Sequence, residues 1–104
     1  MAWYRLNLPV RSADLDAKIN QYRDTVQTMV ARLGGRDMTA RVYCRREIAG
    51  DAKIFLDIDG KQPAGFMLML MRCEAIDAPP RDGLELLGEV ADGGATLRDP
   101  VRPA

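Results

Sequence analysis

The sequence predicts a small α+β protein in which helices pack on one face of an antiparallel sheet. Three observations lead to this fold class. The chain has 104 residues, which suits a single hydrophobic core. Its composition, with 47% hydrophobic and 29% charged residues, is that of an ordinary globular protein. Segments in which apolar and polar residues alternate are interleaved with segments that have a helical period or helix-forming residues.

The first two elements are expected to be a strand over residues 3–10 and a helix over residues 13–33. In the strand, alternation separates an inner face from an outer face that carries Trp3, Arg5 and Asn7. The helix has an apolar stripe with spacings of mostly three and four residues, made by Leu15, Ile19, Tyr22, Val26, Met29, Val30 and Leu33. Ser12 can cap its N-terminus, and Gly34 suits the left-handed position after its last residue.

The next two segments are expected to form an antiparallel hairpin. Residues 39–47 and 53–59 both alternate, and residues 49–51 between them form a turn. The inner side chains of these strands are Ala40, Val42, Cys44, Ile54, Leu56 and Ile58. The outer side chains are Arg41, Tyr43, Arg45, Lys53, Phe55, Asp57 and Asp59.

The segment that follows is apolar without a break from Phe66 to Met71, so periodicity alone does not separate a helix from a buried strand. Composition favours a helix over residues 62–74, because Met and Leu are helix formers and Pro63 suits the first helical position. The alternative is a strand over residues 66–76, which gives one helix on a five-stranded, mostly antiparallel sheet.

One more strand is expected at residues 84–91, and the prolines and glycine of residues 78–83 predict a crossing loop before it. Alternation gives this strand the inner side chains Leu84, Leu86 and Val90 and the outer side chains Glu85, Leu87 and Glu89. Gly88 is a candidate bulge position. Residues 1–91 then form a single α+β domain, and residues 92–104 form a flexible tail that contains Gly and Pro.

The resulting order of elements resembles the ferredoxin-like fold, a βαββαβ two-layer sandwich. The resemblance extends over residues 3–91 and concerns the fold alone, because the chain carries no family motif. It implies an antiparallel sheet with strand order 4-1-3-2, both helices on the inner face, and an open outer face. Folds of this kind serve many functions, so the function has to come from side chains on the outer face.

The outer face carries the candidate binding site. An exposed apolar patch among charged residues is typical of an interaction surface. The candidate partner-binding residues are Trp3, Arg5, Arg41, Tyr43, Arg45, Phe55 and Leu87. The implied strand order puts the acidic fourth strand and the Arg-rich second strand on opposite edges. Two copies packed face to face would then pair Glu85 and Glu89 with arginines of the other copy, which favours a homodimer or another protein partner.

A cover formed by the tail or a loop and a small-ligand pocket are alternative uses of this face. Another is single-stranded nucleic acid. Residues 3–9 resemble the first short motif of RNA-recognition motifs, which stack bases on aromatic rings of this same face. The exposed aromatic of that motif falls on Tyr4, which alternation places inward, and residues 53–59 lack the glycine and aromatic pattern of the second motif. The net charge of zero also disfavours phosphate binding, so nucleic acid is not the expected partner.

Asp57 and Asp59 give a catalytic alternative. Residues 54–60 resemble the hydrophobic strand and DxDG motif of haloacid-dehalogenase-type phosphatases. That resemblance implies that one carboxylate is a nucleophile and the other an acid/base group beside Mg²⁺. In that family the motif belongs to the first strand of a longer, doubly wound domain. Here the motif lies in the middle of the chain, and Lys61 and Gln62 stand where Thr is expected, so a Mg-dependent enzyme is not the leading interpretation.

The residue types exclude several chemistries. The chain has no His, and Cys44 and Cys73 are its two cysteines, so neither Ser-His-Asp nor Cys-His catalysis nor a Cys-rich zinc site can be built. We expect no cofactor, no metal and no catalytic residue, and therefore a non-enzymatic interaction or regulatory protein, such as an inhibitor or antitoxin-like binder. No signal-peptide pattern opens the chain, and the longest apolar run, residues 64–71, is too short to span a membrane. The expected location is the cytoplasm.

Overall fold

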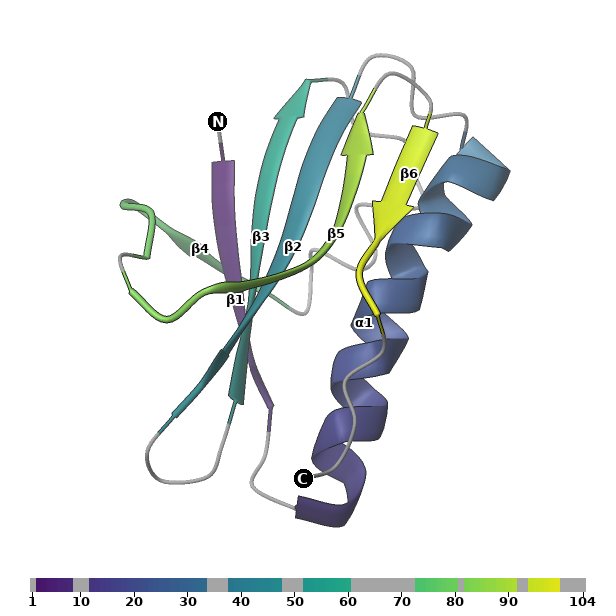
Figure 1. The fold of residues 1–104 in the computed structure, drawn as a ribbon. Coiled ribbons are helices and arrows are strands. Elements are labelled where there is room, and N and C mark those ends of the chain that lie inside the picture. Colours follow the sequence, from purple (N-terminus) through teal and green to yellow (C-terminus); the bar gives the residue numbers. More distant parts are fainter. Residues whose placement is uncertain are drawn as a thin grey trace.

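The computed structural model describes residues 2–8, 12–33, 38–47, 52–60, 73–80, 82–91 and 94–99. In these ranges the chain forms one helix and one six-stranded sheet (Figure 1). The elements are β1 (Ala2–Leu8), α1 (Ser12–Leu33), β2 (Met38–Arg46), β3 (Ala52–Gly60), β4 (Glu74–Ile76), β5 (Glu85–Ala91) and β6 (Gly94–Leu97). The strand order is β4-β1-β3-β2-β5-β6, and every neighbouring pair is antiparallel. The predicted α+β class with an antiparallel sheet is therefore confirmed.

The predicted strand order of the ferredoxin-like fold is wrong. The central trio β1-β3-β2 has the expected arrangement, but β5, the predicted fourth strand, lies beside β2 instead of beside β1. The short strand β4 takes the place next to β1. The reason is that alternation determines which face of a strand is buried but carries no information on its neighbour. In this position β5 and β6 lie with β2 against α1.

The predicted helix over residues 62–74 lies almost entirely outside the described residues. Its last residue, Glu74, is the first residue of β4, so this end of the predicted helix is a strand. The alternative strand over residues 66–76 agrees with the structure at residues 74–76. Among the described residues no helix is both long and apolar enough to cross a membrane.

The hydrophobic core lies between α1 and the inner face of the sheet. From α1, the side chains of Leu15, Ile19 and Val26 are buried there, at positions of the predicted apolar stripe. The sheet contributes Met38, Ala40, Val42, Cys44, Ala52, Ile54, Leu56, Ile58, Leu87 and Val90. Arg46 at the end of β2 also donates a 2.5 Å hydrogen bond to Asp16 of α1, which links the two layers. Full burial of one such aliphatic side chain contributes about 1.5–3 kcal/mol, so this layer stabilises the fold.

A bulge in β5 overturns the predicted orientation of Leu87. The register between β2 and β5 shifts at Val42 and Tyr43, where Tyr43 lies opposite Leu86 and Val42 lies opposite Gly88. Leu87 is the extra residue, and it is 1% exposed and belongs to the inner core. A bulge adds one residue to a strand and so reverses the alternation beyond it. The prediction that Leu87 faces outward and Leu86 inward is therefore wrong.

Gly88 lies at a point of this bulge where β5, β6 and α1 approach one another closely. A Cβ atom at this position would lie 3.1 Å from the Leu97 side chain and 3.2 Å from the Val26 side chain. These distances are shorter than ordinary van der Waals contacts between carbon atoms. The glycine thus allows the helix to pack directly on the backbone of the strand.

Part of the predicted flexible tail belongs to the sheet. Residues 94–97 form β6, which pairs with β5, and Ala95 and Leu97 pack against the core. The backbone N–H of Arg98 extends this pairing with a 2.9 Å hydrogen bond to the carbonyl of Leu87. The sequence predicted a flexible tail because this segment has few apolar residues. Two alternating apolar residues are enough to dock a strand when a neighbouring strand supplies the backbone hydrogen bonds.

Candidate interaction surface on the outer face of the sheet

The outer face is the sheet face opposite α1. Directly opposed residues of an antiparallel pair share a face, so the register defines which side chains meet there. One row across the central trio consists of Trp3, Asp57 and Arg41. The adjacent row consists of Arg5, Phe55 and Tyr43. The next row consists of Asn7, Lys53 and Arg45. Six of the seven predicted site residues thus lie on this face, and Leu87 does not.

The aromatic rings of Trp3 and Tyr43 stack on each other. Their centroids are 5.8 Å apart and their planes differ by 23°. The two residues come from β1 and β2, which flank β3, so the rings lean over the central strand from both sides. Both side chains are half-buried. Such a pair is a rigid, partly exposed aromatic surface of the kind that is enriched at protein interfaces.

Phe55 does not share this exposure. Its side chain is 2% exposed although it belongs to the outer face and lies outside the inner core cluster. The guanidinium carbon of Arg45 lies 5.0 Å from the centroid of the Phe55 ring, within the range of a cation–π contact. The sequence predicted an exposed ring at this position, and the structure corrects that prediction. Phe55 is therefore buried on the outer face, with Arg45 over its ring.

The connection between β4 and β5 contributes to this cover. These strands lie on opposite sides of the central trio, and α1 lies on the inner face, so the connection runs over the outer face. In Figure 1 it crosses in front of the strands before it enters β5. At Gly83, which has a φ of 75°, a Cβ atom would lie 3.6 Å from Cγ of Arg45. The connection therefore rests on the Arg45 side chain, which in turn covers Phe55.

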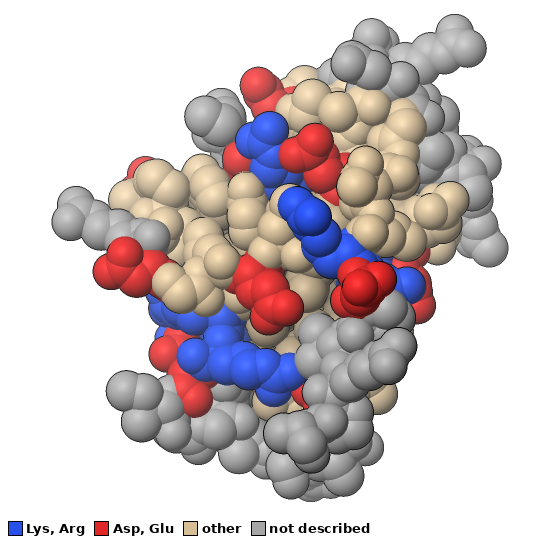
Figure 2. Space-filling model, in the orientation of Figure 1, with Lys and Arg blue, Asp and Glu red and all other residues tan. Residues whose placement is uncertain are grey.

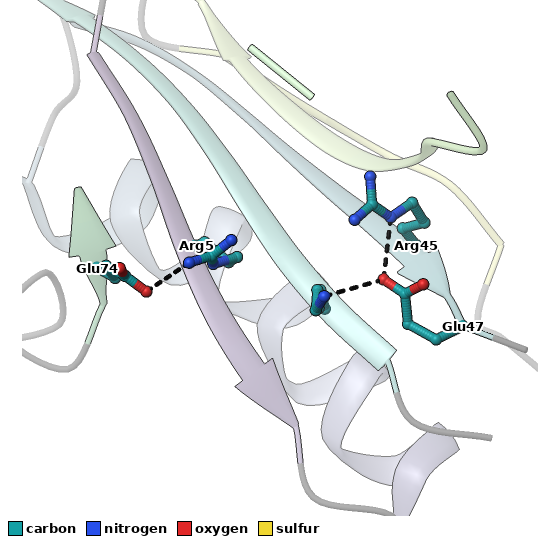
Figure 3. A network of polar contacts seen from close by, with 5 residues as sticks. Arg5, Arg45, Glu47 and Glu74 are labelled. Atoms are coloured by element: carbon teal, nitrogen blue, oxygen red, sulfur yellow. Dashed lines mark hydrogen bonds and ion pairs between the residues drawn. The ribbon is translucent and has the colours of Figure 1, made fainter. Parts of the chain in front are cut away.

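Three arginines of the outer face are each paired with a carboxylate of the same chain. Arg5 of β1 donates a 2.6 Å hydrogen bond to Glu74 of β4 (Figure 3). Beyond the end of β2, the Glu47 carboxylate accepts from Arg45 at 3.1 Å and lies 3.3 Å from the Lys53 amine (Figure 3). The hydrogen bond from Arg45 lowers the pKa of Glu47. These pairs hold the long side chains against the sheet.

A further pair joins β2 to β5 on this face. The Nε of Arg41 donates a 2.5 Å hydrogen bond to Glu89, and this contact raises the pKa of the arginine. The Nη1 of Arg41 also lies 4.0 Å from the carboxylate of Asp57. Figure 2 shows charged side chains of both signs next to one another, with uncharged surface between them. The described face is therefore a mosaic and not a surface of one charge.

This pairing removes the electrostatic argument for the predicted dimer. The sequence analysis put the acidic strand and the Arg-rich strand on opposite edges, but β5 lies directly beside β2. Glu89 is consequently satisfied by Arg41 of the same chain. Glu85 lies opposite Cys44, whose side chain belongs to the inner core, and so does not contribute to the outer face.

Asp57 and Asp59 share the outer face of β3 but are not arranged as an open cation site. The Asp57 side chain is nearly buried beside Arg41, which neutralises the charge that a divalent cation would need. Asp59 accepts a 3.0 Å hydrogen bond from the backbone N–H of Gly60, the residue that ends the strand with a φ of 91°. Within the described ranges no three metal-ligating side chains come together.

Neither Cys44 nor Cys73 is part of a disulfide bond. Cys44 is 1% exposed in the inner core, and its burial raises the pKa of the thiol to about 11. Burial also raises the pKa of Cys73, which is half-buried. Nucleophilic cysteines need the opposite shift, so neither thiol is activated as a nucleophile by its surroundings.

Two apolar residues that the sequence analysis missed extend the outer surface. Ile76 of β4 lies opposite Trp3, and Leu86 of β5 lies opposite Tyr43, so each continues the outer face beyond the stacked rings. Both are half-buried. The candidate bulge at Gly88 was the signal that could have placed Leu86 correctly. No comparable signal existed for Ile76, because its place depends on β4 lying beside β1.

No protein-family model, curated protein or solved structure matches this chain.

Proposed function

We propose that the protein is a cytoplasmic, non-enzymatic interaction or regulatory module that binds a protein partner through the outer face of its sheet. The partner is another protein or a second copy of the chain. The stacked rings of Trp3 and Tyr43 are the centre of this surface, and Ile76 and Leu86 extend it on either side. Arg5, Arg41 and Arg45 form its polar surroundings.

The observation that carries this proposal is the half-buried aromatic stack on the face opposite the helix. The ring planes are within 23° of parallel and come from two strands of one sheet, so a partner meets a surface that is already ordered. An ordered aromatic surface loses little side-chain entropy on binding, and Trp and Tyr are prominent among residues that dominate binding energy. The surrounding ion pairs supply a polar rim.

The proposal is tested by comparing two alanine substitutions on the outer face of β1. Trp3→Ala removes one ring of the stack, whereas Asn7→Ala removes an exposed polar side chain four residues along the same strand. We expect Trp3→Ala to abolish self-association in sedimentation velocity or to abolish capture of a partner from the host, and Asn7→Ala to retain it. Circular dichroism verifies that both variants are folded. A strict monomer whose Trp3→Ala variant keeps every partner contradicts the proposal.

Single-stranded nucleic acid is a second candidate, supported by the stacked rings beside Arg41. The paired state of the outer arginines weighs against it, because each described arginine of this face already contacts a carboxylate. This candidate is tested by titrating the protein with a single-stranded oligonucleotide at low salt and measuring the fluorescence of its single tryptophan. Quenching that weakens as salt increases supports nucleic-acid binding. Unchanged fluorescence removes this candidate.

A further inference from the structure

We draw no further inference here: the strongest candidate, the apolar patch on the outer face of the sheet that Ile76 and Leu86 form with the stacked rings of Trp3 and Tyr43, belongs to the surface already described, and nothing in the described part of the chain shows which partner covers it.

Discussion

The two faces of the sheet are organised by different interactions. The inner face holds aliphatic side chains that are buried against α1 and the rest of the core, at positions spaced two apart along β2 and β3. In the described part of the chain, the outer face holds rings and long charged side chains that are fixed pair by pair, through the Trp3–Tyr43 stack, the contact of Arg45 with Phe55 and several ion pairs. The comparison indicates that the inner face supplies stability, whereas the outer face supplies an ordered surface at little cost to the fold.

The largest effect should follow from truncating the inner face. Ile54 of β3 is fully buried, so Ile54→Ala removes buried methyl groups and leaves a cavity. We expect the free energy of unfolding to fall by about 2–5 kcal/mol, measured by chemical denaturation. A loss of less than about 1 kcal/mol, within the range of surface substitutions, would show that the inner face is loosely packed and would weaken the comparison.

The buried thiol of the inner face should make stability depend on alkaline pH. The pKa of Cys44 is about 11 in the folded protein, against an ordinary value of 9.0. The unfolded chain therefore releases the thiol proton first, and stability is lost as pH rises from about 9 to 11, by on the order of 2 kcal/mol. Denaturation of the wild type and Cys44→Ala across this interval isolates the contribution. Parallel pH profiles for the two proteins would contradict the burial of this thiol.

The bulge offers a matched pair of glycine substitutions. Gly88→Ala forces a methyl group to within 3.1–3.2 Å of Leu97 and Val26, so we expect it to destabilise the protein by about 1–3 kcal/mol. Gly94→Ala in β6 places its methyl group at an ordinary 3.6 Å from the Ala91 carbonyl and should change stability by less than about 0.5 kcal/mol. Thermal unfolding of both variants checks the difference. Similar midpoints would mean that α1 does not approach β5 as closely as described.

The smallest effect is expected on the outer face. A double-mutant cycle with Arg41→Ala and Glu89→Ala should give a coupling free energy of about 0.2–1 kcal/mol that decreases with added salt, because half of the Arg41 side chain is exposed. The cycle is needed because Arg41→Ala alone also leaves Asp57 without its neighbouring cation. A coupling free energy above about 2 kcal/mol would be typical of a buried ion pair. The outer face would then contribute to stability as the inner face does.

The parts of the fold that the sequence predicted are those determined by local periodicity. The stripe of Leu15, Ile19 and Val26 predicted α1, and the alternation around Val42 and Leu56 predicted the faces of β2 and β3. Periodicity does not predict which strands are neighbours in the sheet, because every strand offers the same backbone hydrogen-bonding groups.

For the candidate site, too, local periodicity predicted which face a side chain lies on, but not the contacts that depend on distant segments. Trp3 and Tyr43 were placed on one face by alternation, and the structure stacks them there. Leu87 was misplaced because a single extra residue in β5 reverses the pattern, and Phe55 was expected to be exposed because nothing local shows that a distant connection rests on Arg45. Pairing of Arg41 with Glu89 likewise depends on β5 lying beside β2.

The central position of β3 has a consequence for synthesis of the chain. β1 precedes its main hydrogen-bonding partner by more than forty residues, so its backbone groups have no ladder until β3 has been made. Once β1, β3 and β2 are joined, both outer edges of this three-stranded sheet stay unpaired until β4, β5 and β6 are added. Unpaired edges attract strands of other chains. By pairing with these edges, the later strands protect the sheet from aggregation. A nascent chain that stalls before residue 74 lacks all three of them.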